Sequence, residues 1–398
     1  MKTNMAEVKP DIESVANIKV VGVGGGGSSA VNRMVAAKVK GVDFIVMNTD
    51  VQALHYTKAA IKLHIGKTVT RGLGAGMNPD LGRKSAEESQ NEIKETLKGA
   101  DMVFVTCGLG GGTGSGAAPV VAEIARDMGA LTIAVVTRPF TFEGVQRKHI
   151  ADQAYDELAD RVDACIVVPN DRILQIVDKK TTLIEAFQAS DEVLRQGVEG
   201  IAELITQPGY VNVDFADVKS IMQNAGTALM GIGRASGEDR AINAAKAAVT
   251  SPLLETSIDG ARGVLFVVTG GPDLAMHEVS EAAKIVTSSA DENARVIFGT
   301  VIDENMKDEI RITVIATGFS GAHRAQTPMT ERVPQKHYSP NPVVERREPE
   351  VEKEEEEPRR EIFEKKAAAP LPPLDEPEKR DNDNEDLDIP AFIRRRMK

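Results

Sequence analysis

Glycine is concentrated where strand-like segments of this 398-residue chain give way to helix-like segments. Six of the nine residues in "GLGGGTGSG" (108–116) are glycine, directly after the apolar run "DMVFVTC". A second cluster lies in "VVGVGGGGSSAV" (20–31), and a third is "GLGAG" (72–76). Backbone amides of glycine-rich turns form concave nests for anions, and a following helix adds the positive end of its dipole. The clusters predict a phosphate-binding site, to which Thr113 and Ser115 add hydroxyl donors.

Two known nucleotide-binding motifs can be compared with the sequence to identify the ligand of the predicted phosphate-binding site. Gly22-x-Gly24-x-x-Gly27 satisfies the dinucleotide-binding fingerprint, and Asp50 follows about 20 residues on. An NAD-dependent oxidoreductase is therefore one alternative, although it leaves the other two clusters unused. "HIGKT" (64–68) resembles the end of a P-loop, but the first glycine of that motif would fall at Ile61. Several nests together suit a chain of phosphates better than one pyrophosphate.

Other reactive side chains are sparse. The six histidines show no metal-ligand spacing, and no metal ligand is assigned. Cys107 and Cys165 lie in apolar runs, which predicts buried, reduced thiols. Asp214 and Asp217 stand at i, i+3 before "VKSIMQNAG", where two acids complement the dipole at the start of a helix. The residues alone leave open whether this pair has a further role.

Strand and helix patterns alternate through the first half of the chain. Continuous Val/Ile runs predict strands buried on both faces, and the alternation predicts a doubly wound α/β domain with a parallel sheet. We expect strands at 18–23, 44–48, 101–107, 131–137 and 164–170, and helices at 28–37, 80–99, 117–129 and 144–161. A long central helix is expected at 181–209, ended by Pro208-Gly209, and a smaller α/β unit follows.

Composition limits the classes of function. The net charge of −12 argues against a nucleic-acid partner. No apolar run approaches the roughly 20 residues needed to span a bilayer, and the N-terminus lacks a signal-peptide core, so we expect a cytoplasmic protein. Residues 320–385 are rich in Pro and Glu and are predicted to be disordered. The final "LDIPAFIRRRMK" is again apolar and basic, which by composition fits either attraction to anionic surfaces or a short docking helix.

Four motifs together resemble one family. "GGGTGSG", "NTD" (48–50), "RPFTFEG" (138–144) and "NVDFADV" (212–218) are similar to the FtsZ family of tubulin-like bacterial cell-division GTPases. The resemblance runs from about Ile18 to Gly318 and resumes at "DIPAFIRRR". It implies the tubulin/FtsZ-like fold, GTP and GDP as ligands with Mg²⁺, and GTP hydrolysis.

The resemblance also implies which positions bind the nucleotide. Phe187 would pack on the base and Asp191 would accept from guanine N1 and N2. Family members usually carry Gly-Asn at the Ser28-Ser29 positions, so a hydroxyl here replaces an amide contact. The remaining implied GTP-binding residues are Gly25, Gly26, Gly27, Ser28, Ser29, Asn48, Asp50, Ala75, Gly76, Gly112, Thr113, Gly114, Glu143, Arg147 and Asn170.

Catalysis in the family is shared between subunits, and this too is carried over by position. Asp214, Asp217 and Asn212 match the residues that enter the pocket of the next subunit and act on the attacking water. The resemblance thus implies a head-to-tail filament that builds the division ring at mid-cell. The tail residues matching a docking peptide for membrane-tethering division partners are Asp388, Ile389, Pro390, Phe392, Ile393 and Arg394. Arg394 to Arg396 are also a candidate contact with anionic lipid.

These patterns divide the chain into six expected parts. They are a flexible N-terminus (1–16), a GTP-binding domain (17–180), the central helix (181–209), a GTPase-activating domain (210–318), an acidic linker (319–385) and a partner-binding peptide (386–398). Besides the oxidoreductase, a filament-forming tubulin-like GTPase outside cell division remains an alternative. The "DIPAFIRRR" peptide argues against it.

Overall fold

The computed structural model describes residues 16–178, 180–206, 211, 213–254, 257–304 and 306–319. The predictions for Asn212, for the N-terminal segment before residue 16 and for everything from residue 320 onward lie outside these ranges. Within them, ten strands are joined in one sheet of order β3-β2-β1-β4-β5-β6-β7-β10-β8-β9.

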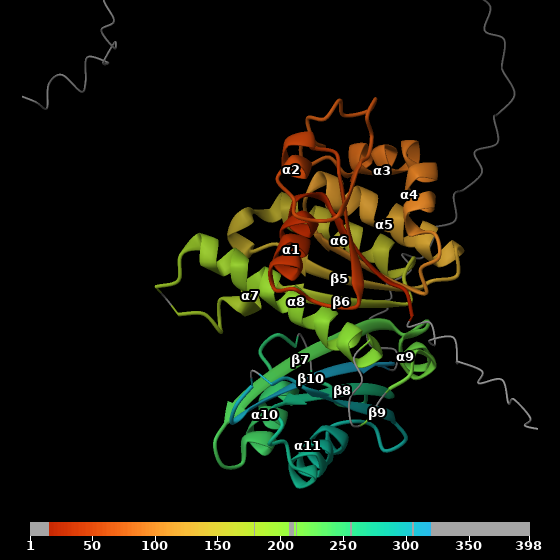
Figure 1. The fold of residues 1–398 in the computed structure, drawn as a ribbon. Coiled ribbons are helices and arrows are strands. Elements are labelled where there is room, and N and C mark those ends of the chain that lie inside the picture. Colours follow the sequence, from red (N-terminus) through yellow and green to blue (C-terminus); the bar gives the residue numbers. More distant parts are fainter. Residues whose placement is uncertain are drawn as a thin grey trace, which may run out of the picture. The chain divides into compact units, whose positions relative to one another are not determined.

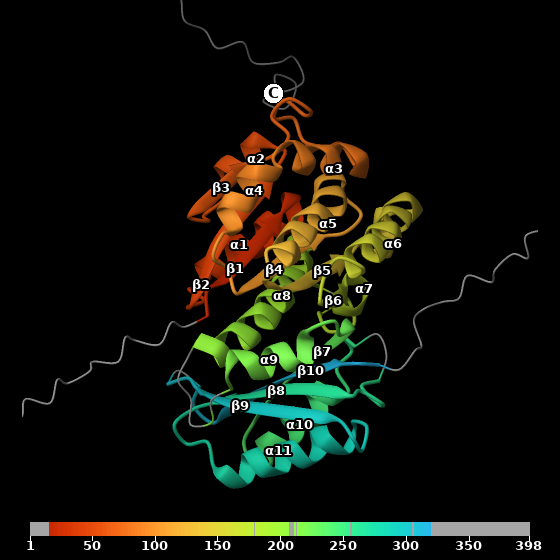
Figure 2. The ribbon, with the colours of Figure 1, turned by 90° about the vertical axis from the view of Figure 1, so that its right-hand side faces the viewer.

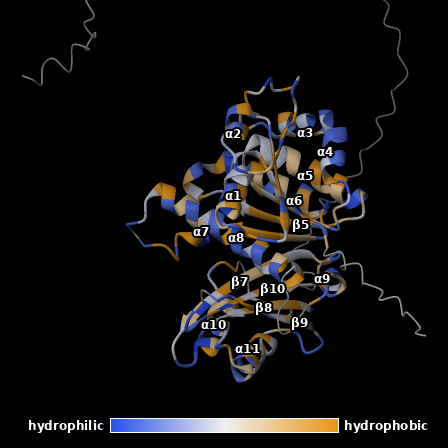
Figure 3. Ribbon diagram, in the orientation of Figure 1, coloured by the Kyte–Doolittle hydropathy of each residue, from blue (hydrophilic) through white to orange (hydrophobic). Residues whose placement is uncertain are grey.

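The first six strands form a parallel sheet, as the uninterrupted apolar runs predicted. They are β1 (Ile18–Val23), β2 (Val42–Asn48), β3 (Ile61–His64), β4 (Met102–Gly108), β5 (Leu131–Arg138) and β6 (Ala164–Pro169). Every residue of β1 is buried, and so are the first six of the seven in β4. The apolar colouring of the strands in Figure 3 agrees with burial on both faces.

Helices cover both faces of this sheet (Figures 1 and 2). One apolar layer joins α1 (Gly24–Ala36) and α8 (Leu183–Thr206) to the sheet. The other layer joins α3 (Pro79–Glu88), α4 (Gln90–Leu97), α5 (Gly112–Asp127) and α6 (Val145–Ala159). Short helices α2 (Val51–His55) and α7 (Asn170–Ile173) follow β2 and β6. The doubly wound α/β domain is confirmed.

The second half of the described chain extends the same sheet. β7 (Gly226–Ser236) pairs in parallel with β6, β10 (Glu309–Thr317) lies antiparallel between β7 and β8 (Gly263–Gly270), and β9 (Arg295–Ile302) is parallel to β8. α10 (Arg240–Val249) and α11 (Met276–Ser288) form a separate apolar layer with one face of these strands. α9 (Phe215–Met222) connects the two halves.

Three predicted elements need correction. The helix expected at 80–99 is two helices, because it breaks at Ser89, whose hydroxyl is buried and accepts from the Gly66 amide (3.2 Å). The helices expected from residues 28 and 117 begin earlier, at Gly24 and Gly112, so the glycines form their first turns. Strand β3 and helix α2 were not predicted, since neither has a long enough pattern.

Cys107 and Cys165 are free and buried, as predicted. Burial raises the pKa of the Cys165 thiol to about 12 and raises that of Cys107 further. Across the described ranges, no helix is long and apolar enough to cross a membrane.

Candidate nucleotide-binding site

The strand order places a ligand crevice at the ends of β1 and β4. These neighbours lie at the centre of the parallel sheet, and the chain leaves β1 toward β2 and β3 but leaves β4 toward β5 and β6. At such a switch point the connections diverge and leave a crevice outside the carboxyl ends of the strands. Helix α1 begins directly after β1, and α5 begins four residues after β4. The first and third glycine clusters therefore meet at this crevice.

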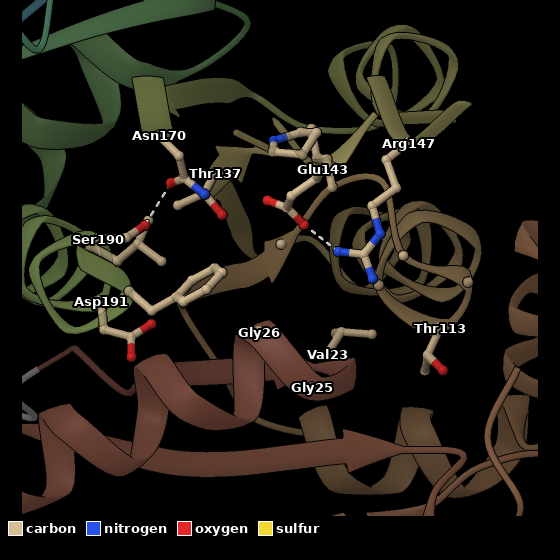
Figure 4. Close-up of a pocket in the computed structure, with 18 residues that line it drawn as sticks. Val23, Gly25, Gly26, Thr113, Thr137, Glu143, Arg147, Asn170, Ser190 and Asp191 are labelled. Carbon is tan, nitrogen blue, oxygen red and sulfur yellow. Dashed lines mark hydrogen bonds and ion pairs between the residues drawn. The ribbon is translucent and has the colours of Figure 1, made fainter. Parts of the chain in front are cut away.

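A cleft of about 320 Å³ occupies this position (Figure 4). Its walls come from the starts of α1 and α5, the ends of β4 and β5, and one side of α8. The lining residues are Val23, Gly25, Gly26, Gly108, Leu109, Gly111, Gly112, Thr113, Gly114, Thr137, Pro139, Glu143, Arg147, Asn170, Phe187, Ser190, Asp191 and Leu194.

Several cluster glycines are required by backbone-to-backbone packing inside the protein. A Cβ on Gly27 would lie 2.4 Å from the Thr106 carbonyl oxygen, and one on Gly26 would lie 2.9 Å from the Gly108 amide nitrogen. A Cβ on Gly24, whose φ is +70°, would lie 2.9 Å from the Gly114 amide nitrogen. No larger residue fits at these contacts without moving the backbone. The first and third glycine clusters thus pack directly on each other.

Gly25 and Gly111 are different. A Cβ at either position would meet no described heavy atom within 4 Å, although both residues line the cleft. Packing within the chain does not explain why they lack side chains. Close approach of a ligand to the backbone does explain it.

One end of the cleft suits an anion. Helices α1 and α5 direct their first-turn amides into it, without a side-chain cap or an acidic residue in the first turn. Those amides and the helix dipoles together favour negative charge. Arg147 lies at the same end and forms an ion pair with Glu143, also on the wall (Figure 4).

The other end combines an aromatic surface with a carboxylate. Phe187 is 41% exposed, and its ring meets that of buried Phe140 edge-on at 5.3 Å. Asp191, on the next turn of α8, lies on the opposite side of Gly25 and Gly26 from Thr113 (Figure 4). Burial raises the pKa of its carboxyl to about 6, against the opposing effect of Arg33. A desolvated carboxylate of this kind is stabilised by a ligand that donates hydrogen bonds.

Asn170 is fixed at this end by its neighbour. The Ser190 hydroxyl donates to Asn170 Oδ1 at 2.7 Å, and both residues are buried. This bond leaves the amide nitrogen of Asn170 as a donor on the wall of the cleft.

Seven of the implied binding residues are not on the wall of the cleft: Gly27, Ser28, Ser29, Asn48, Asp50, Ala75 and Gly76. The Ser28 hydroxyl donates to the Gly24 carbonyl at 2.6 Å, while Ser29 is exposed. Asp50 caps α2 by accepting from the Ala53 amide at 3.0 Å. Ala75 lies behind the wall, because a Cβ on Gly112 would be 2.9 Å from that of Ala75.

Eight lining residues were not named individually as binding residues from the sequence, although Gly108, Leu109 and Gly111 belong to the predicted glycine cluster 108–116. They are Val23, Gly108, Leu109, Gly111, Thr137, Pro139, Ser190 and Leu194. Val23, Gly108, Thr137 and Pro139 stand at or just after the ends of strands β1, β4 and β5. Knowing the strand order would have indicated them, since ligands bind at those ends near the switch point.

Asp214 and Asp217 lie at the start of α9, and neither lines the cleft. Asp214 is the N-cap, and its Oδ1 accepts from the Asp217 amide at 2.7 Å. The interpretation of this pair as a helix start is thus confirmed. Both side chains are exposed, and the cap uses one oxygen of Asp214.

Fold and cleft together are typical of a nucleotide-binding α/β protein, with two helix N-termini at one end of the cleft and a desolvated carboxylate at the other. The description "Tubulin/FtsZ family, GTPase domain" matches residues 17–178, and "FtsZ family, C-terminal domain" matches residues 226–320. An FtsZ dimer from M. jannaschii is 47% identical, with a TM-score of 0.74 over 77% of this chain and 89% of that one. The chain therefore belongs to the FtsZ family, and it is a GTPase.

More distant relatives share the fold. CetZ2 from Haloferax volcanii, described as a GTPγS-bound protofilament, has 23% identity and a TM-score of 0.65 over 75% of this chain and 92% of that one. CetZ1 from the same organism, a GDP-bound monomer, has 21% identity and a TM-score of 0.66 over 77% and 96%. The family matches favour the GTPase over the NAD-dependent oxidoreductase.

Substitution of the two kinds of cluster glycine should have separate effects, one on stability and the other on nucleotide binding. Gly27→Ala is expected to destabilise the fold by roughly 1–3 kcal/mol, because its Cβ overlaps backbone atoms. Gly25→Ala should leave stability unchanged but weaken GDP binding about tenfold, since its methyl enters the cleft. Urea unfolding and equilibrium dialysis measure the two effects. Equal loss of stability in both variants would contradict this assignment.

Proposed function

We propose that this chain hydrolyses GTP at a site shared between adjacent subunits of a head-to-tail filament. The observation that carries the proposal is the separation of the two halves of the site. The cleft contains binding groups, whereas Asp214 and Asp217 are exposed on α9, away from its wall. Asn212 belongs with this pair in the proposal. A contact between unlike faces of identical subunits repeats into a filament if its rotation does not close.

Exposed apolar side chains near the cleft support such a contact. Phe142 is 62% exposed and stacks on Phe140, and Val145 is 85% exposed at the start of α6. Leu183 and Ile184, at the start of α8, are 60% and 70% exposed. A second subunit would remove this surface from water. The M. jannaschii FtsZ is described as a dimer and the CetZ2 as a protofilament.

Within one subunit, we assign the anion-binding end to the phosphates and the other end to guanine. Gly25, Gly26, Gly112, Thr113 and Gly114 bring backbone amides to the phosphates. Glu143 and Arg147 act between the phosphates and the ribose. Phe187 packs on the base, and Asn170 donates beside it. Asp191 accepts from guanine N1 and N2, a pair of donors that adenine lacks.

The remaining implied residues do not line the cleft, and their proposed nucleotide contacts are at its phosphate end. Gly27, Ser28 and Ser29 belong to the first turns of α1, while Asn48, Asp50, Ala75 and Gly76 belong to the segments beside the phosphate end. Bound Mg²⁺ would neutralise phosphate charge and is usually held by phosphates, waters and one or two carboxylates, so Asp50 is the residue that fits it. The described residues contain no cluster of three or more potential metal ligands.

Hydrolysis then depends on positioning. GTP cleavage needs an in-line water and stabilisation of charge on the transferred phosphoryl group, with little covalent chemistry. The cap on α9 fixes Asp214 through one oxygen and leaves the second oxygen to orient water. Asp217, in the first turn of the same helix, adds a second carboxylate. Removing the charge of either carboxylate should lower the hydrolysis rate by a larger factor than it lowers the affinity for the nucleotide.

The biological setting is proposed from the family. We infer a cytoplasmic division-ring protein at mid-cell with the six parts given above, tethered to the membrane through partners of residues 388–394. Deleting residues 386–398 should abolish co-purification of those partners and leave the GTPase rate unchanged. Retained partners would contradict this role and favour the alternative, a filament-forming GTPase outside cell division.

A shared site predicts that activity depends on protein concentration. The GTPase rate per subunit, measured with Mg²⁺, should rise above a threshold that coincides with pelleting of polymer. Asp214→Asn should still pellet but hydrolyse GTP at least about tenfold more slowly, because Asn preserves the helix cap while removing the charge. A rate per subunit that is independent of concentration would show that each cleft is complete by itself.

The raised pKa of Asp191 predicts a pH-dependent preference for guanine. Hydrogen bonds donated by guanine stabilise the Asp191 carboxylate, so binding lowers the pKa of this group. The preference for guanine should therefore be greatest above pH 6, where the carboxyl is already ionised. It is lost as the pH falls below 6, where the carboxyl is protonated before binding. The measurement is the affinity ratio of GDP to IDP, which lacks the 2-amino group, at pH 5 and pH 8. Phosphate titration cancels in this ratio, and a pH-independent ratio would contradict the assignment.

A further inference from the structure

Asp163 joins three segments at the edge of the sheet opposite the nucleotide cleft. It directly precedes β6 and is 5% exposed. Its Oδ2 accepts from the Thr132 amide at 2.9 Å, in β5, and its carbonyl accepts from the Gly226 amide at 3.0 Å, at the start of β7. Its Oδ1 accepts from the Asn224 amide at 3.3 Å. This carboxylate therefore attaches the segment after α9 to the parallel strands.

Asn224 follows the C-cap of α9 and makes a second contact through its side chain. Its Oδ1 accepts from Arg126 Nη2 at 2.8 Å. Arg126 lies in the last turn of α5, where its Nη1 donates to the Asp160 carbonyl at 3.2 Å and its Nε lies 4.0 Å from Asp163 Oδ1. Asn224 has a φ of +53°, a left-handed conformation that Asn adopts more readily than most residues. Both its backbone and its side chain are thus bound to the parallel half of the fold.

Packing alone does not fill the space at this end of α9. A cleft of about 300 Å³ lies here, and Lys219 and Gln223, of α9 and its C-cap, line it together with Arg126. The apolar contacts that α9 makes elsewhere have no preferred direction, whereas hydrogen bonds do. The two bonds to Asn224 therefore limit how far α9 can turn or slide.

The orientation of α9 matters because this helix carries the proposed catalytic pair. Its eight residues span about 12 Å, so Asp214 and Asn224 lie just beyond opposite ends of one short helix. A misplacement of about 1 Å at a reacting group can lower a rate by about 10²-fold. A contact that fixes one end of α9 therefore bears on the chemistry at the other end.

We propose that Asn224 is a positioning residue for GTP hydrolysis. Bound to Arg126 and Asp163, it fixes the orientation in which α9 presents its acidic pair to the next subunit. This inference rests on the proposed function for the role of that pair. Asn224 does not line the nucleotide cleft, so loss of its side chain should leave nucleotide binding intact.

The test compares two substitutions at this position. Asn224→Gly keeps the backbone amide and the left-handed conformation but removes the oxygen that accepts from Arg126. The GTPase rate per pelleted subunit should fall about fivefold or more, because α9 is held less firmly. The affinity for GTPγS in equilibrium dialysis and the concentration threshold for pelleting should be unchanged. Asn224→Asp keeps an acceptor for Arg126 and should retain at least about half of the rate.

Arg126→Ala removes the same contact from the other side. It should lower the rate by a similar factor, and the double variant with Asn224→Gly should lose no more than either single variant. Glu123→Gln is the matched control. It removes an ion pair of 3.2 Å between the same helix α5 and Arg161, and it should leave the rate unchanged. If Arg126→Ala does not fold, the two substitutions of Asn224 still decide the question.

Three results would overturn the inference while the shared site stands, provided that Asp214→Asn still hydrolyses GTP slowly. They are an unchanged rate in Asn224→Gly, a rate in Asn224→Asp that is equally low, and losses that multiply in the double variant. A fall in GTPγS affinity or in pelleting that matches the fall in rate also overturns it, because the contact would then only support the fold. If Asp214→Asn is fully active, the proposed function fails as well.

Discussion

The close contact between the first and third glycine clusters is the constraint on which the site depends. α1 and α5 start at neighbouring strands, and their first turns approach closely enough that a Cβ on Gly26 or Gly27 would overlap backbone of β4. Two helix N-termini are thereby aimed into one cleft. Their dipoles reinforce each other only because no side chain separates them. Several glycines lose conformational freedom on folding, which is unfavourable. Burial of helix α5 offsets this cost.

The long helix α8 ties this cleft to the second half of the chain. Phe187 and Asp191 lie near its start, and Glu199, further along, pairs with Arg195 at 2.6 Å and with Arg311 of β10 at 3.4 Å. These side chains are nearly buried, so the pairs fix relative position more than they add stability. The continuous helix α8 thus joins the wall of the cleft to strand β10 of the second half of the chain.

Sequence reasoning predicted the fold class and the phosphate end because both have periodic or compositional signals. Runs of Val and Ile specified the parallel strands, and the clusters of glycine specified the crevice. The break at Ser89 had no such signal, because a tertiary hydrogen bond to Gly66 causes it. Thr137 and Ser190 likewise had no local signal, because Thr137 reaches the cleft through the order of the strands and Ser190 through the packing of α8.

Asp214 and Asp217 show where local and family-based arguments differ. Locally they begin a helix, and the structure has that geometry. The proposed catalytic role would depend on a neighbouring subunit, so the sequence of one chain contains no local signal for it. Only the resemblance of "NVDFADV" to the family predicts it.

The most direct test of the shared site mixes two inactive variants. Asp191→Asn should bind GTP poorly but retain an intact α9, and Asp214→Asn should bind GTP but lack the catalytic charge. If one subunit's α9 completes the next subunit's cleft, a 1:1 mixture should regain about a quarter of the unmodified GTPase rate, the fraction of interfaces that pair two intact halves. A mixture no more active than the sum of its components would contradict the account.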